Sequence, residues 1–132
     1  GASFPMALGF KAGSPKSPVV CLTGDGGFLL NCQELETAVR EKLNVLTVVF
    51  NDAGFGNVRA YQKVKCDGRY ICDYGNPPFG EMARLFGAGG RQVETVEQLK
   101  QAVGEALRSE RPFVIDVKMT REELAKPGFL PD

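Results

Sequence analysis

The chain has 132 residues, 43% of them hydrophobic, and its 16 basic side chains balance 16 acidic ones, so the formal net charge is zero. This length supports one domain with a real core, and the charge balance gives no electrostatic attraction for nucleic acid or a membrane surface. There is no histidine, which excludes Ser-His-Asp and Cys-His catalysis and histidine-ligated metals. Any chemistry must therefore come from carboxylates, backbone amides, a bound ion or a cofactor.

The cysteines indicate a reducing compartment. Cys21, Cys32, Cys66 and Cys72 form no CxxC pair, so we interpret them as reduced thiols of an intracellular, cytoplasmic protein without a zinc site. No apolar stretch is long enough to span a bilayer, and residues 1–13 lack the basic start and apolar core of a signal peptide.

Two buried strands are predicted in the first half of the chain. Residues 1–13, with Pro5 in the first turn, predict a closely packed helix, and residues 14–18 predict a turn. Residues 19–23 (VVCLT) and 45–50 (VLTVVF) are apolar runs too short for helices. Neither run alternates polar with apolar residues, so both strands are expected to be covered on two faces, as in a parallel sheet.

An amphipathic helix is predicted between these strands, because Leu35, Val39 and Leu43 recur every four residues beside Ala38. A strand–helix–strand crossover is right-handed in nearly all cases. Both strands are therefore expected to end at the same edge of the sheet.

The middle of the chain predicts a helix at 57–62 and then a polar, exposed and mobile loop at 63–75. Asn76 and Pro77 predict the start of the next helix, as its cap and first residue, and Gly87 predicts its end. The side chains expected on the inward face of this helix are Phe79, Met82, Ala83 and Phe86.

The last third predicts a strand at 91–94, a helix opened by a capping box at 95–98, a strand at 113–117 and a polar tail at 120–132. No internal repeat or second domain is visible, so residues 1–132 are expected to form a single α/β domain, a three-layer sandwich with a mainly parallel sheet. The side chains expected on the inward face of the last helix are Val96, Leu99, Val103, Ala106 and Leu107.

Each of the first two strands is followed by a carboxylate, Asp25 and Asp52. Open parallel sheets bind ligands at the carboxyl ends of their strands. Gly24, Gly26 and Gly27 remove side chains there, so backbone N–H groups can approach a phosphate closely. Few carboxylates completed by phosphate oxygens are the usual arrangement for Mg²⁺. The pattern therefore predicts a Mg²⁺-diphosphate site.

Each part of this pattern also has a plainer interpretation. A GDGG sequence is common as a tight turn, and Asp52 alone could cap a helix. A function of another class would be a non-catalytic nucleotide- or phosphate-binding α/β module, of the receiver or flavodoxin kind. A receiver needs adjacent acids after its first strand and an acceptor aspartate far downstream, and Asp25 and Asp52 do not reproduce that pattern.

Several segments in order resemble the thiamine-diphosphate (ThDP) enzymes. GDGG followed, after a helix and a strand, by Asn51-Asp52 resembles the family's cofactor motif, written GDG and then NN. GASFPMALG is similar to the family's GYGLPAAIG, NPPFGEMARLFG to NPDFxxLAxAFG, and ERPFVIDVKM to its closing strand. The resemblance covers nearly the whole chain and is strongest to enzymes such as acetolactate synthase, benzoylformate decarboxylase and pyruvate decarboxylase. It departs at Asp52, where the family usually has a second asparagine.

The resemblance implies the diphosphate-binding domain of a ThDP-dependent decarboxylase or carboligase that acts on a 2-oxo acid. It implies that Mg²⁺ is bound by the side chains of Asp25 and Asp52 and by the carbonyl of Gly54, and that Asn51 braces the turn. The cofactor-binding residues that it implies are Gly24, Asp25, Gly26, Gly27, Asn51, Asp52, Gly54, Phe55 and Gly56.

The same resemblance implies partners for this chain. The glutamate that activates the cofactor lies, in the family, on a pyrimidine-binding domain, usually of a neighbouring subunit, and no glutamate here matches its motif. Catalytic residues therefore stay unassigned. The chain is expected to be a piece of a longer polypeptide, lacking the family's first strand and helix, to need a pyrimidine-binding domain on the same or another chain, to be inactive alone and to form a homo-oligomer.

Three further residues have both a functional and a plainer interpretation. Arg59 and Gln62 fall on the helix that borders the substrate pocket in the family, and a solvated helix face is an equally good interpretation of them. Glu34 matches a glutamate often present in the family's first helix, but a solvated helix residue explains it equally well, so it is left out of the site.

Overall fold

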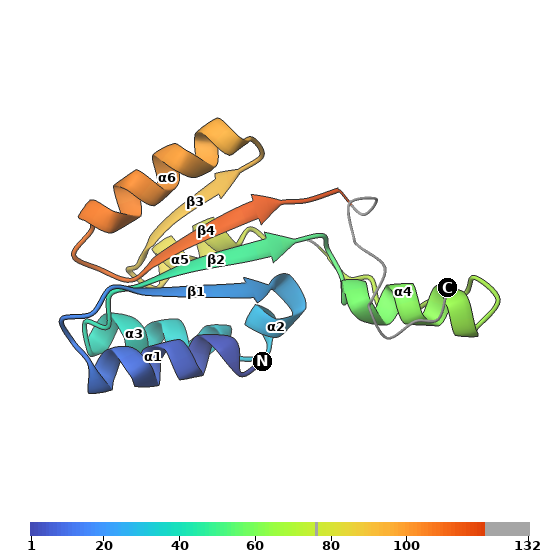
Figure 1. Ribbon diagram of the computed structural model, residues 1–132, viewed down its shortest axis with the longest axis horizontal. Helices are drawn as coiled ribbons and strands as arrows, with labels where there is room; N and C mark the ends of the chain where they lie inside the picture. Colours follow the sequence, from blue (N-terminus) through green and yellow to red (C-terminus); the bar gives the residue numbers. More distant parts are fainter. Residues whose placement is uncertain (76, 121–132) are drawn as a thin grey trace.

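The computed structural model describes residues 1–75 and 77–120 and contains a four-stranded parallel sheet between two unequal helical layers (Figure 1). Every neighbouring pair of strands is parallel. This confirms the α/β class and the parallel sheet. In spatial order the strands are β1 (Val19–Gly24), β2 (Val45–Asn51), β4 (Phe113–Lys118) and β3 (Gly89–Val93).

One face of the sheet carries most of the helices, and the other carries α6 (Val96–Arg108) (Figure 1). The chain between β1 and β2 is broken into α2, η1 and α3, whereas the sequence predicted one continuous crossover helix. The helical elements on the first face are α1 (Ser3–Gly13), α2 (Asp25–Leu29), η1 (Cys32–Glu34), α3 (Leu35–Arg40) and α5 (Phe79–Leu85).

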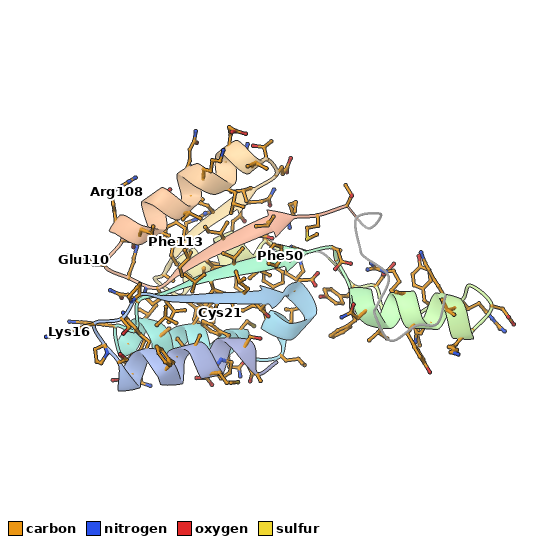
Figure 2. All side chains as sticks on the ribbon, viewed as in Figure 1. Lys16, Cys21, Phe50, Arg108, Glu110 and Phe113 are labelled. Carbon is orange, nitrogen blue, oxygen red and sulfur yellow. The ribbon has the colours of Figure 1, made fainter. Side chains whose placement is uncertain are left out.

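Each face has its own hydrophobic core. On the first face, the ring of Phe28 contacts Phe4 at a centroid distance of 5.1 Å and Phe79 at 5.5 Å, both edge to face, which joins α1, α2 and α5. Leu35 and Ala38 are fully buried there, as the predicted inward face requires. Cys21, labelled in Figure 2, belongs to the same cluster, and burial raises the pKa of its thiol.

The expectation that both early strands are covered on two faces holds for β2 and is wrong for β1. Val20 and Leu22 of β1 are 54% and 61% exposed. Helix α6 packs on β2, β3 and β4, so the corresponding face of β1 has no helix over it among the described residues.

The helix predicted at 57–62 is longer than expected: α4 is Gly56–Lys65, so its last turn takes the place of the predicted start of the loop. Figure 1 shows α4 projecting beyond the carboxyl edge of the sheet. Helix α5 begins at Phe79, later than the predicted start at Asn76 and Pro77. Pro77 precedes Pro78, and a residue before proline is biased away from helical geometry. Asn76 itself lies outside the described residues.

The remaining elements match the predictions with small shifts. Gly87 ends α5 with a positive φ of 91°, but Phe86 is 38% exposed and does not face inward. The Thr95 hydroxyl accepts from the Gln98 N–H at 3.2 Å, which confirms one half of the capping box at α6, whereas the Gln98 Oε1 accepts from the Glu94 N–H at 2.8 Å and not from that of Thr95. Strand β3 begins two residues early, at Gly89.

On α6 the inward face consists mainly of alanine. Ala102 and Ala106 are buried and Leu99 and Val103 are partly buried, whereas Val96 and Leu107, both predicted to face inward, are 62% and 65% exposed. Most of the tail predicted at 120–132 lies outside the described residues. In the described part of the chain, no helix is both long and apolar enough to cross a membrane.

Candidate functional site

The ends of β1 and β2 bring the two predicted carboxylates together. The strands pair in parallel with Gly24 opposite Phe50, and Asp25 and Asp52 follow within two residues. Figure 2 labels Phe50 at the end of β2 from which the chain runs on to α4. Both carboxylates line one pocket of about 250 Å³. The pocket contains every predicted cofactor-binding residue except Asn51, and its other lining residues are Phe50, Asn57, Val58 and Met119.

Asp25 is 2% exposed and held by two backbone amides. The Gly26 N–H donates to its Oδ1 at 2.8 Å, and the Gly54 N–H donates to its Oδ2 at 3.2 Å. Burial raises the pKa of Asp25, the two amides oppose that rise, and the charge of Asp52 adds to it. The second bond joins the turn after β2 directly to the turn after β1.

Asp52 is 7% exposed and paired with a buried arginine, Arg59 of α4. Arg59 Nη1 donates to Asp52 Oδ2 at 2.7 Å, and Arg59 Nε donates to Asp73 Oδ1 at 2.6 Å. Burial works to lower the pKa of Arg59, but the hydrogen bonds and charges of the two aspartates outweigh it and raise the pKa. With only 2% of its surface exposed, Arg59 is not part of a solvated helix face.

Asn51 lies beneath the turn and not in the pocket. Its Oδ1 accepts from the Ala53 N–H at 3.2 Å, and Ala53 has a φ of 58°, a left-handed conformation that non-glycine residues rarely adopt. The Asn51 Nδ2 donates to Asp116 Oδ1 of β4 at 2.8 Å. Asn51 therefore connects the turn to the middle of the sheet.

The glycines of the site leave room for neighbouring groups and do not adopt unusual backbone angles. None of Gly24, Gly26 and Gly27 has a positive φ. A Cβ on Gly26 would come within 2.5 Å of the Phe55 ring, and one on Gly54 would collide with the Arg59 guanidinium. Gly24 alone among them faces open space.

Part of the predicted mobile loop at 63–75 forms the back of the site instead. Gly54 and Asp73 form an antiparallel bridge, and the Phe55 N–H donates to the Cys72 carbonyl at 3.0 Å. The Tyr74 ring contacts Phe55 edge to face at 5.5 Å. The run at 70–74 (YICDY) is less polar than the rest of the stretch, which is the sequence feature that marks this backing segment.

Tyr74 also brings a buried hydroxyl to the site. Burial raises the pKa of Tyr74, and the neighbouring Asp25 charge raises it further. The hydroxyl has no hydrogen bond of good geometry to a described residue. The phenol therefore stays neutral beside the carboxylate at ordinary pH.

Gln62, on the same helix as Arg59, is only partly buried and caps a neighbouring turn. Its Oε1 accepts from the Ile71 N–H at 3.1 Å, away from the pocket lining. Glu34 is also outside this pocket and accepts from the Thr37 hydroxyl at 2.8 Å.

The donor set at this edge is small. No three Cys, Asp or Glu side chains converge on one point in the part of the chain that the structure describes. Two buried carboxylates and nearby backbone groups suit a cation whose remaining ligands come from water or a ligand, which is how Mg²⁺ is usually held. The residues present thus suit Mg²⁺, with part of its coordination left to water or a ligand, better than a metal ion that is bound by protein groups alone.

Comparison with known proteins shows the family of the chain. The family model described as thiamine pyrophosphate enzyme, C-terminal TPP binding domain, matches residues 1–117. Acetolactate synthase of Bacillus subtilis (strain 168) is 38% identical over 117 residues, which are 89% of this chain and 20% of the relative. The large subunit of acetolactate synthase isozyme 3 of Escherichia coli (strain K12) is 36% identical over 132 residues, covering 96% of this chain and 23% of the relative.

Solved structures show the same relationship. The thiamine diphosphate-dependent 4-hydroxybenzoylformate decarboxylase of Rhodococcus jostii RHA1 superposes with a TM-score of 0.83 at 28% identity, over 89% of this chain and 23% of that chain. Benzoylformate decarboxylase from Polynucleobacter necessarius gives a TM-score of 0.82 at 31% identity, over 96% of this chain and 24% of that chain. The chain thus spans less than a quarter of the length of each of these proteins. It belongs to the family of C-terminal TPP-binding domains of thiamine pyrophosphate enzymes.

Proposed function

We propose that this chain binds Mg²⁺ and, through it, the diphosphate of ThDP. The observation that carries the proposal is the burial of Asp25 and Asp52 in one pocket at the carboxyl edge of the sheet. Such an edge is where open parallel sheets bind ligands. Membership in a family of TPP-binding domains supports the same ligand.

The carboxylates have capacity left for a cation. Each oxygen of Asp25 accepts one backbone N–H, and a carboxylate offers about four lone-pair sites. Asp52 uses its Oδ2 for Arg59. A cation here would also offset the unfavourable burial that raises the pKa of Asp25. In the proposal Asp25 and Asp52 bind Mg²⁺ by their side chains and Gly54 by its carbonyl.

The rest of the pocket suits the diphosphate end of the cofactor. Gly24 faces open space, so a ligand can approach the backbone there. Phe50, Val58 and Met119 form an apolar part of the lining beside the polar edge. When bound, ThDP supplies an electron sink for a developing carbanion.

We further propose that the parent protein is a 2-oxo acid decarboxylase or carboligase of the acetolactate synthase kind. The names of the acetolactate synthases and benzoylformate decarboxylases that the chain resembles support this class. In the proposal a pyrimidine-binding domain, on the same or another chain, supplies the activating glutamate within an oligomer. The match of residues 1–117 to the TPP-binding family model favours this function over a non-catalytic phosphate-binding module of the receiver or flavodoxin kind.

Thermal unfolding with and without ligands tests the binding site. Mg²⁺ and ThDP together should stabilise the chain, by about 2.7 kcal/mol at a hundred times the dissociation constant, and each alone should do so less. Asp25→Ala should abolish the effect, whereas the matched control Glu97→Ala, on an exposed face of α6, should keep it. Equal melting curves with and without Mg²⁺ and ThDP at millimolar concentration would refute the site.

A further inference from the structure

Strand β4 carries a carboxylate, Asp116, with 0% exposure. It does not line the pocket, yet it is the hub of three polar contacts. It accepts from Asn51 Nδ2 at 2.8 Å and from the Phe79 N–H at 3.2 Å, and Lys118 Nζ lies 3.1 Å from its Oδ2. Burying a charge is costly even when it is paired and hydrogen-bonded, and a hydrophobic side chain of similar size would often serve core packing as well, so this arrangement needs a reason beyond core packing.

The contact with Asn51 decides which way that amide points. An ionised carboxylate only accepts hydrogen bonds, so Asn51 must turn its Nδ2 toward Asp116. Its Oδ1 then faces the opposite way and accepts from the Ala53 N–H. With the amide flipped, oxygen would face carboxylate and NH₂ would face N–H, and both hydrogen bonds would be lost.

The Ala53 N–H belongs to the strained point of the turn. Ala53 has a φ of 58°, a conformation that costs free energy for any residue with a Cβ and persists only where the surroundings hold it. Its two neighbours are Asp52 and Gly54, both in the pocket lining. The orientation of Asn51 therefore controls how these two groups are presented.

We propose that Asp116 is a positioning residue of the Mg²⁺-diphosphate site, which acts through Asn51 on the turn formed by Asp52, Ala53 and Gly54. The inference rests on the proposed function for its consequence on Mg²⁺. The orienting contact itself is a property of the metal-free chain.

Two measurements on the full chain test the proposal. In the first, Mg²⁺ is titrated calorimetrically in the presence of excess ThDP. Asp116→Asn should weaken Mg²⁺ binding by about 10- to 100-fold, the range for residues that orient metal ligands. Lys118→Met is the matched control: it removes another partner of the same buried carboxylate and should lower stability, but it leaves the Asn51 contact, so Mg²⁺ affinity should stay at the wild-type value.

In the second, hydrogen exchange of the Ala53 amide is followed by NMR without ligand. Asp116→Asn should speed this exchange, and Lys118→Met should not. The double variant Asn51→Asp with Asp116→Asn exchanges the two side chains. The introduced amide can donate to the introduced carboxylate, which can still accept from Ala53. This variant should restore both slow exchange and Mg²⁺ affinity.

The outcomes separate this inference from the proposed function. Unchanged Ala53 exchange and unchanged Mg²⁺ affinity in Asp116→Asn would overturn the positioning role, as would a double variant that recovers stability without recovering either readout. If the wild-type chain binds no Mg²⁺ with ThDP, the proposed function fails, and the exchange measurement still decides whether Asp116 holds the turn. If Asp116→Asn does not fold, slow exchange in a folded double variant supports the proposal and fast exchange overturns it.

Discussion

Arg59→Met would leave the Asp52 carboxylate buried without its cation. Arg59 is 2% exposed and Asp52 is 7% exposed, so water can do little to solvate the orphaned charge. Removing one partner of a buried ion pair typically costs about 3–5 kcal/mol. The second contact, to the more exposed Asp73, is expected to add less than about 1 kcal/mol. Methionine keeps most of the side-chain volume, so the loss reports charge and hydrogen bonding rather than a cavity.

The assay is urea unfolding of the metal-free chain, repeated with Mg²⁺ and ThDP. A loss of this size is a large part of the roughly 5–15 kcal/mol of a typical domain, so the variant should fold but unfold at clearly lower urea. If a cation binds beside Asp52, it replaces part of the missing charge. Mg²⁺ with ThDP should therefore stabilise Arg59→Met more than it stabilises the wild type.

Arg40→Met is the matched control, since Arg40 pairs with Glu36 on the exposed face of α3 and both side chains are more than half exposed. It should cost less than about 1 kcal/mol and leave the ligand effect unchanged. The reasoning fails if Arg59→Met costs no more than Arg40→Met. Equal stabilisation of wild type and Arg59→Met by Mg²⁺ and ThDP would place the cation away from Asp52.

Three other outcomes are expected. Asp52→Ala should abolish the binding of ThDP with Mg²⁺ measured by calorimetry, whereas Asp52→Asn should retain it because an amide oxygen can still coordinate Mg²⁺. An unchanged ThDP affinity in Asp52→Ala would show that Asp52 is not a metal ligand. Burial raises the pKa of Asp25, so the metal-free chain should lose stability as pH rises through that pKa. Protons also compete with Mg²⁺ at higher pH than they would at an ordinary aspartate, so Mg²⁺ affinity should fall on acidification. An Mg²⁺ affinity that stays constant down to the ordinary pKa of aspartate contradicts this. The isolated chain should self-associate through the exposed apolar face of β1, and Leu22→Lys should reduce the association measured by light scattering. A wild-type chain that stays monomeric at high concentration refutes this prediction.

Local patterns in the sequence were sufficient for the frame of the site. The apolar runs at 19–23 and 45–50 predicted β1 and β2 because buried parallel strands need continuous hydrophobicity. The helical connection between them predicted that both strands end at one edge, which places Asp25 and Asp52 together. These features depend on neighbours in sequence and on one handedness rule.

What surrounds that frame was decided by contacts between distant segments. Arg59 lies 7 residues from Asp52 and 14 from Asp73, and no periodic pattern marks it as buried. Asp116 meets Asn51 across 65 positions, a contact that exists only because β4 lies next to β2 in the sheet.

The exposed face of β1 and the start of α5 were also decided by contacts between segments that are distant in the sequence. Strand β1 was expected to be covered on both sides, but α6 crosses only the other strands, so Val20 and Leu22 remain exposed. Helix α5 begins where the Phe79 N–H meets Asp116, two residues beyond the predicted Pro77. The hydrophobic pattern of the sequence determines which segments form strands and helices. The arrangement of those segments in space determines which charged side chains become buried and which groups these side chains hold in place.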